Sequence, residues 1–286
     1  MKKILVLITC LIFLGGCFNN ETMKNTDTLT TVYPVEYVTN ILYGKYSTVE
    51  SIYPPGADTK NYKLTNKQKN KFSKFTTFIY CGINKETETA VDLLNKNSKI
   101  QLIDALKGMN VESSIEEMWL NPSNYLMLAR NIKNGLEEYE RNVYTKEKIE
   151  KAYEELKVKI SEIDVDLTLI GKNAVNNNIL VSNDLFNYLT KYKIKVISLD
   201  KKNENLDKSF GEAKKLIESK KIHYIYTIKG EVLSDKLVEF VANNNLEVVE
   251  IDTLSSLTEA QRNNSEDYMS VMKENIDSYK KELYTK

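Results

Sequence analysis

Residues Tyr144–Ile163 read YTKEKIEKAYEELKVKISEI and lie near the middle of the 286-residue chain. The apolar side chains of this stretch recur with the spacing of one helical face: Ile149, Tyr153, Leu156, Ile160 and Ile163. Thr145 is a suitable N-cap, and no glycine or proline interrupts the run. An ordinary surface helix would fit this pattern. Its central position and the α/β patterns on both sides favour a helix that joins two lobes.

The flanking sequence alternates short β-branched or aromatic runs with helical runs, which predicts parallel βα units. In the first lobe the predicted strands are Leu29–Tyr33, Tyr46–Tyr53, Thr76–Tyr80 and Ile100–Ile103, and the helices are Val35–Tyr43, Asn66–Phe75, Thr87–Leu94 and Ser123–Glu138. In the second lobe the first strand is either Leu167–Ile170 or Ile179–Ser182. The other strands there are Lys195–Ser198, Tyr224–Thr227 and Glu247–Ile251, and the helices are Leu185–Tyr192, Leu206–Ser219, Leu233–Asn244 and Glu266–Leu283.

The fold class is therefore α/β, with two lobes of parallel-sheet βα units joined by a long backbone helix. We place the first lobe at residues 29–142, the linking helix at 143–164 and the second lobe at 165–286. We expect little other chain contact between the two lobes.

The N-terminus has the pattern of an export signal. Lys2 and Lys3 precede an apolar run from Ile4 to Leu14 that is too short to span a bilayer. The run ends in Leu14-Gly15-Gly16-Cys17, which resembles a lipobox, so residues 1–17 are predicted to be a lipoprotein signal peptide with Cys17 as the lipidated residue. A plain signal sequence with a chance cysteine is the alternative. Residues 18–28 are polar and are predicted to be a flexible tether. The lipid on Cys17 is expected to anchor the exported protein to the outer face of the cell membrane.

Charge and cysteine content exclude several classes of protein. The chain has 40 Lys+Arg against 40 Asp+Glu and no basic block with interleaved aromatic residues, so we expect no nucleic-acid partner. Cys10 is removed with the signal and Cys17 is taken up by the lipid, so Cys81 is the only thiol left and no intrachain disulfide is expected. The chain also has no P-loop, no Gly-x-Ser-x-Gly and no Cys-x-x-Cys, so we expect no enzyme.

Five segments, taken in order, resemble the metal-binding lipoproteins of ABC transporters for zinc and manganese. They are Val32-Tyr33-Pro34, Tyr53–Asp58, Trp119-Leu120-Asn121-Pro122, Ser182–Leu189 and Asp267–Ile276. The resemblance covers nearly the whole mature chain. It implies two α/β lobes joined by a long helix, a cognate ABC permease as partner, a monomer, and a metal held between the lobes by three histidines and one carboxylate.

The positions that match those metal ligands are substituted in this chain. The histidine positions hold Lys60, Glu117 and Asn183, and the carboxylate position holds Ile228, with Glu231 the nearest acid. The only histidine, His223, is read as a partly exposed residue at the start of a strand. A lysine ammonium has no lone pair to offer a metal, so we expect it to pair with Glu117 or Glu231 in the volume that metal fills in relatives.

The resulting hypothesis is an extracytoplasmic substrate-binding lipoprotein with degraded metal affinity. No cofactor is assigned, and zinc or manganese is implied by the resemblance alone. Two alternatives remain open at this point. One is a binding protein retuned to another small polar solute, anchored by Lys60 and Glu117. The other is a surface lipoprotein that serves adhesion or partner contact without transport.

Overall fold

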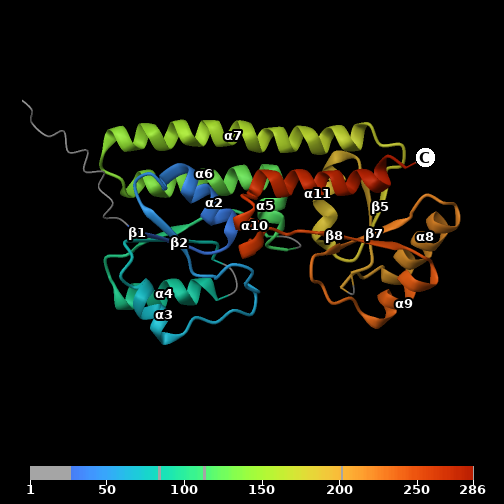
Figure 1. Cartoon of the computed structure of the whole chain (residues 1–286), viewed down its shortest axis with the longest axis horizontal. Helices are drawn as coiled ribbons and strands as arrows, with labels where there is room; N and C mark the ends of the chain where they lie inside the picture. Colours follow the sequence, from blue (N-terminus) through green and yellow to red (C-terminus); the bar gives the residue numbers. More distant parts are fainter. Residues whose placement is uncertain (1–26, 83–84, 112–113, 201, 286) are drawn as a thin grey trace, which may run out of the picture.

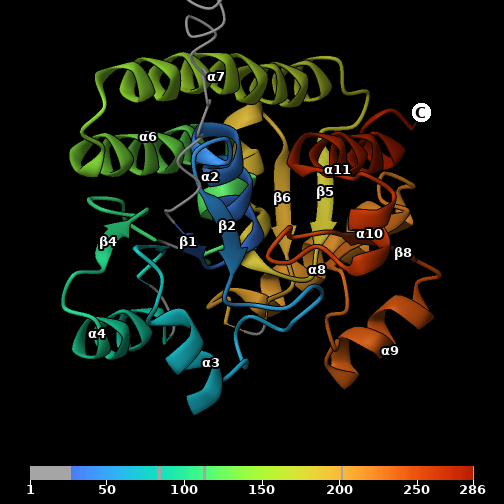
Figure 2. The same ribbon diagram turned by 60° about the vertical axis from the view of Figure 1, so that its left-hand side comes forward.

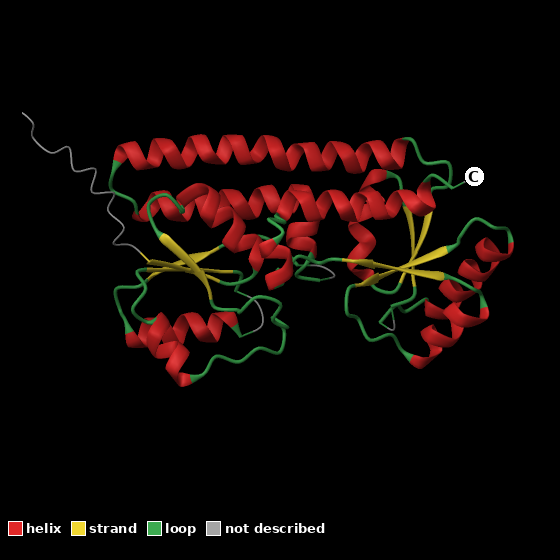
Figure 3. Cartoon of the chain, in the orientation of Figure 1, coloured by secondary structure: helices red, strands yellow, loops and turns green. Residues whose placement is uncertain are grey.

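A computed structural model describes residues 27–82, 85–111, 114–200 and 202–285. The predicted signal peptide, the lipidated Cys17 and most of the predicted tether lie outside these residues. Within them the chain forms two α/β lobes, each built on one parallel sheet with helices on both faces (Figures 1 and 3). The predicted fold class is confirmed.

The first lobe contains a four-stranded sheet in the order β2-β1-β3-β4. Its strands are β1 (Asp27–Thr30), β2 (Thr48–Ser51), β3 (Thr77–Tyr80) and β4 (Gln101–Asp104), and its helices are α2 (Tyr33–Tyr43), α3 (Asn66–Phe72), α4 (Glu86–Lys96), α5 (Glu117–Leu120) and α6 (Pro122–Tyr139). Because β1 begins at Asp27, the last two residues of the predicted tether, 27 and 28, belong to the sheet. They pair with Thr48 and Val49 of β2, and Thr28 also pairs with Thr77 of β3.

The second lobe repeats this plan with a sheet in the order β6-β5-β7-β8. Its strands are β5 (Asn178–Val181), β6 (Lys195–Ser198), β7 (Tyr224–Ile228) and β8 (Glu247–Ile251), and its helices are the 3₁₀ helix η1 (Asp184–Tyr192), α8 (Leu206–Glu218), α9 (Asp235–Asn243), α10 (Glu259–Asn263) and α11 (Tyr268–Leu283). The strand order reverses between β5 and β7, which gives the sheet a topological switch point.

The central helix α7 (Val143–Lys172) is longer than predicted. Asn142, rather than Thr145, caps it by accepting from the backbone N–H of Tyr144 at 2.9 Å. The helix continues past residue 164 because the buried positions Leu167 and Ile170 keep the helical spacing. Of the two candidate first strands in the second lobe, 167–170 is therefore helical and 179–182 is close to the observed β5. Figure 1 shows α7 running over both lobes, with α6 and α11 beneath it.

One apolar core runs through both lobes. It includes Leu29 of the first sheet, Ile160 of α7 and Val181 of the second sheet. Side chains alternate across β5, so Ile179 and Val181 face this shared core while Leu180 packs with α8 and α9 in a smaller cluster. The lobes therefore share buried surface through α7 and its neighbours.

The prediction of little other contact between the lobes is wrong. After β8 the chain returns to the first lobe, where Ser255 O accepts from the backbone N–H of Tyr33 at 3.1 Å. Arg262 of α10 donates to both oxygens of Glu36 in α2, at 2.7 and 2.8 Å. The indole N–H of the buried Trp119 donates to Thr253 O at 2.7 Å. Residues 253–262 thus follow the last strand of the second sheet and form hydrogen bonds to the first lobe. We refer to them as the returning segment.

Candidate functional site

A cavity of about 610 Å³ lies between the lobes. It is placed at the carboxyl ends of β5, β7 and β8, where parallel sheets of this type bind ligands. The described residues around it fall into three groups. The first lobe contributes the loop 56–60 and Glu116, and the second lobe contributes Asn183, residues 228–231 and Asp252. The returning segment contributes Thr253, Ser255, Ser256, Thr258 and Gln261.

Four of the five predicted cleft residues line this cavity. Lys60, Asn183, Ile228 and Glu231 are brought together although they are far apart in the sequence. Among the described lining residues, Glu116 stands where Glu117 was expected. Glu117 lies toward Tyr188 of η1: burial raises the pKa of Tyr188 to about 12, and the Glu117 charge also acts to raise it.

The ion pair in the first-lobe wall joins Lys60 to Glu116, where we had predicted Glu117 or Glu231 as the acid. The ammonium nitrogen lies 2.7 Å from Glu116 Oε1, and the carboxylate is 4% exposed whereas the lysine side chain is 56% exposed. The second oxygen of Glu116 accepts from the hydroxyl of Ser114. A nearly buried carboxylate needs compensation by a countercharge and hydrogen bonds, and Lys60 and Ser114 supply them.

The loop that carries Lys60 is held in place by the returning segment. Gly56 has φ +73°, a conformation that favours glycine. Its N–H donates to Leu257 O at 3.0 Å and to Ser256 Oγ at 2.9 Å. Asp58 closes the loop by accepting from Asn61 Nδ2 at 2.7 Å and from the Lys60 N–H at 3.0 Å, and these hydrogen bonds keep its pKa below its usual value.

The polar side chains of Asn183 and Glu231, which line the cavity in the second lobe, form hydrogen bonds within that lobe. Asn183 caps η1, with its amide oxygen accepting from Leu185 N at 2.9 Å. Glu231 Oε2 accepts from Ser182 Oγ at 2.5 Å and from Ile228 N at 3.1 Å. The oxygen of Asn183 is therefore already engaged in shaping the wall, as is one oxygen of Glu231.

Asp252 is a lining residue that we did not predict. It follows β8, and its Oδ2 lies 3.0 Å from Lys229 Nζ and 3.1 Å from Gln261 Nε2. Its other oxygen accepts from Leu254 N at 2.8 Å. Its position directly after a strand was the available signal, since the carboxyl ends of parallel strands meet at one edge.

The described residues around the cavity do not form the ligand cluster that is typical of zinc sites. Zinc ions need several lone pairs from imidazole, thiolate or carboxylate groups at about 2.0–2.3 Å. Among the residues that the structure describes, no group of three or more His, Cys, Asp or Glu side chains could hold a metal ion. Two of the carboxylates around the cavity, Glu116 and Asp252, are each paired with a lysine.

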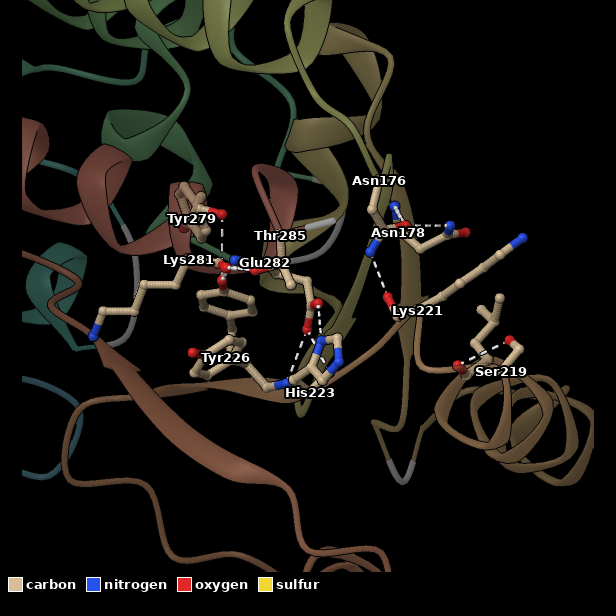
Figure 4. A network of polar contacts seen from close by, with 12 residues as sticks. Asn176, Asn178, Ser219, Lys221, His223, Tyr226, Tyr279, Lys281, Glu282 and Thr285 are labelled. Atoms are coloured by element: carbon tan, nitrogen blue, oxygen red, sulfur yellow. Dashed lines mark hydrogen bonds and ion pairs between the residues drawn. The ribbon is translucent and has the colours of Figure 1, made fainter.

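The single histidine lies outside this site. His223 precedes β7, with its side chain 40% exposed, in agreement with the sequence interpretation. Its Nδ1 lies 3.0 Å from Oε1 of the buried Glu282, whose Oε2 accepts from the His223 N–H at 2.8 Å (Figure 4). This pair joins the end of α11 to the start of β7.

Residues 29–282 match the family described as zinc-uptake complex component A, periplasmic, abbreviated ZnuA. This chain belongs to the ZnuA family. The resemblance drawn from the five sequence segments is thereby confirmed.

Individual relatives agree with this assignment. The zinc-binding lipoprotein AdcA of Streptococcus pneumoniae is 26% identical over 98% of this chain and 61% of its own length, so the chain spans about three fifths of AdcA. A metal ABC transporter substrate-binding lipoprotein of Lactococcus lactis is 24% identical over 97% of this chain and 96% of its own. The crystal structure of the Zn(II)-bound ZnuA-like domain of S. pneumoniae AdcA has a TM-score of 0.70 and 25% identity, covering 91% of this chain and 99% of that domain.

The helices of this ZnuA family member do not have the character of membrane spans in the part of the chain that the structure describes. Within residues 27–285, apart from the few that are not described, no helix combines the length and the hydrophobicity of a membrane span.

Proposed function

We propose that this protein is the extracytoplasmic substrate-binding component of an ABC importer, attached to the membrane through lipid on Cys17, and that its affinity for zinc and manganese is degraded. Family membership and the names of the relatives support the importer role. The lipobox-like Leu14–Cys17 supports the anchor.

The observation that best supports a degraded affinity for zinc and manganese is the Lys60–Glu116 ion pair. A lysine occupies a position that matches a histidine ligand in the family, and its ammonium sits 2.7 Å from the buried carboxylate that lines the same cavity. A dication entering this site would meet a fixed positive charge and would have to displace it from Glu116.

Calorimetry with Zn²⁺ and Mn²⁺ on metal-stripped protein tests this proposal. We expect weak or absent binding. The matched variants are Glu116→Gln in the cavity and Glu155→Gln on the exposed face of α7, where the side chain is 68% exposed. Submicromolar binding that is lost in Glu116→Gln and retained in Glu155→Gln would refute the loss of affinity. Recovery of binding in the combined change Lys60→His, Glu116→His and Asn183→His, at three residues that line the cavity, would support the placement of the ligand positions around it.

The cavity also supports a second candidate, capture of a small polar solute. Its volume of about 610 Å³ is that of a small-molecule pocket rather than of a single ion. Hydroxyl groups line it from the first lobe and the returning segment: Thr59, Thr253, Ser255, Ser256 and Thr258. A panel of amino acids and small diamines, read by the shift in melting temperature, tests this candidate. A shift that persists unchanged in Lys60→Gln would argue against Lys60 as an anchor.

A further inference from the structure

The segment around α3 concentrates positive charge. Residues 59–85 contain seven lysines and no aspartate or glutamate, although the whole chain is balanced at 40 basic and 40 acidic residues. The rest of the chain therefore holds 33 basic against 40 acidic residues. Such an asymmetry orients a protein in the field of a charged surface.

The structure places several of these lysines on one outward face. α3 buries Phe72 against the lobe, and Lys67, Lys71 and Lys74, spaced by four and three residues, are exposed. Lys63, also exposed, precedes the helix. We refer to these four lysines as the basic face of α3. Figures 1 and 2 show α3 and α4 on the side of the first lobe away from α7.

Most of this charge is not compensated within the protein. Lys71 pairs with Glu50 at 2.7 Å, and both side chains are largely exposed to solvent. In the part of the chain that the structure describes, Lys63, Lys67 and Lys74 form no ion pair. The basic face of α3 therefore presents at least three positive charges to solvent.

The end of α3 lies next to the point at which the chain enters the first lobe. Thr76 follows Lys74 by two residues, and both its N–H and its hydroxyl donate to Asp27 O at 3.0 Å. Asp27 is ten residues after Cys17, and ten residues span at most about 35 Å in any conformation. A lipid on Cys17 would therefore keep the basic face of α3 close to the bilayer.

We propose that the basic face of α3 docks on the anionic headgroups of the membrane to which the protein is anchored. This inference rests on the proposed lipidation of Cys17. Each lysine near an anionic leaflet strengthens docking by about fivefold within a Debye length of about 8 Å. The acidic remainder of the chain is repelled by the same surface, so the two effects favour one orientation with α3 toward the membrane.

The lipidated protein reconstituted into vesicles allows a direct test, because the chain has a single tryptophan. Energy transfer from Trp119 to a dansyl-labelled lipid reports how close the folded part lies to the surface. We expect higher transfer in vesicles containing phosphatidylglycerol than in pure phosphatidylcholine, and a return to the lower value at 0.5 M salt. The triple variant Lys67→Gln, Lys71→Gln and Lys74→Gln should lower the equilibrium constant between the docked and undocked orientations of the anchored protein roughly 100-fold. Energy transfer in vesicles containing phosphatidylglycerol should fall accordingly.

The matched control is Lys208→Gln, Lys214→Gln and Lys215→Gln on α8, which removes the same charge from exposed positions of the other lobe. It should leave the transfer unchanged. Equal transfer in the two kinds of vesicle overturns the proposal and leaves an acidic protein as the alternative occupant of this face. Equal loss in the two triple variants also overturns it. Failure of the protein to stay with pure phosphatidylcholine vesicles would instead contradict the lipid anchor of the proposed function.

Discussion

Gly171 allows α7 to approach η1, and replacing it with alanine should weaken the fold. Gly171 lies one residue before the end of α7, and a Cβ built on it would be 1.9 Å from Tyr192 O and 3.0 Å from the carbonyl carbon of the same residue. Both atoms belong to the backbone of η1, so no side-chain rotation can relieve the overlap. α7 and η1 would have to separate by about 1 Å or more.

Two opposing effects set the size of the change. An alanine inside a helix is favoured over glycine by about 1 kcal/mol. Overpacking against a fixed neighbour costs about 1–3 kcal/mol, and the very short distance to Tyr192 O places this case at the upper end. The expected net loss is about 2 kcal/mol, which lowers Tm by roughly 4–8 °C in a protein of this size.

Thermal melting followed by circular dichroism measures this loss, and Gly211→Ala is its control. Gly211 lies inside α8 and has no other atom within 4 Å of its built Cβ. Its replacement should therefore stabilise the protein by up to about 1 kcal/mol. If Gly171→Ala melts at or above the temperature of the unmodified protein, the close contact between α7 and η1 is not a constraint and the reasoning is wrong.

Three further outcomes are expected. Cys17→Ala should abolish labelling by radioactive fatty acid and release the protein from the membrane fraction; unchanged labelling would contradict the lipobox interpretation. Leu156→Ala should cost about 2–5 kcal/mol in urea unfolding because Leu156 is 1% exposed, whereas Val158→Ala, at a position 60% exposed, should stay within about 0.5 kcal/mol. Burial raises the pKa of Glu86 from 4.5 to about 7, so the folded state binds its proton more tightly and stability is lost as pH rises between these values. The free energy of unfolding should therefore fall more from pH 4.5 to 7 in the unmodified protein than in Glu86→Gln, and parallel curves would rule this out.

The sequence was sufficient for the architecture because strand and helix periods differ clearly in most segments. It failed at the end of α7, since Leu167–Ile170 is a short apolar run that fits a strand as well as the helix that the structure shows. It also failed on the return of the chain after β8. That segment has no clear periodicity, and Leu254 and Ser265 have positive φ, which a sequence pattern does not reveal.

The site was predicted to the level of the segments but not of every side chain. Alignment to the family led to Lys60, Asn183 and Glu231, which the structure places around one cavity. It could not separate Glu116 from Glu117, because adjacent helical residues point about 100° apart and both are acids. Asp252 was missed because the alignment to the family offers no ligand position after the strand 247–251, although its place at the carboxyl end of that strand was a usable signal.

The dependence of the first lobe on residues 253–262 has a consequence during synthesis. Tyr33 leaves the ribosome about 220 residues before Ser255, a delay of roughly 10–45 s at ordinary translation rates. Throughout that time the carboxylate of Glu36 lacks the partner that satisfies it in the finished protein, and the indole N–H of Trp119 lacks its own partner from the moment Trp119 is made. The first half of the nascent chain thus stays incomplete, exposed to chaperones and proteases, until residues 253–262, just before α11, have been made.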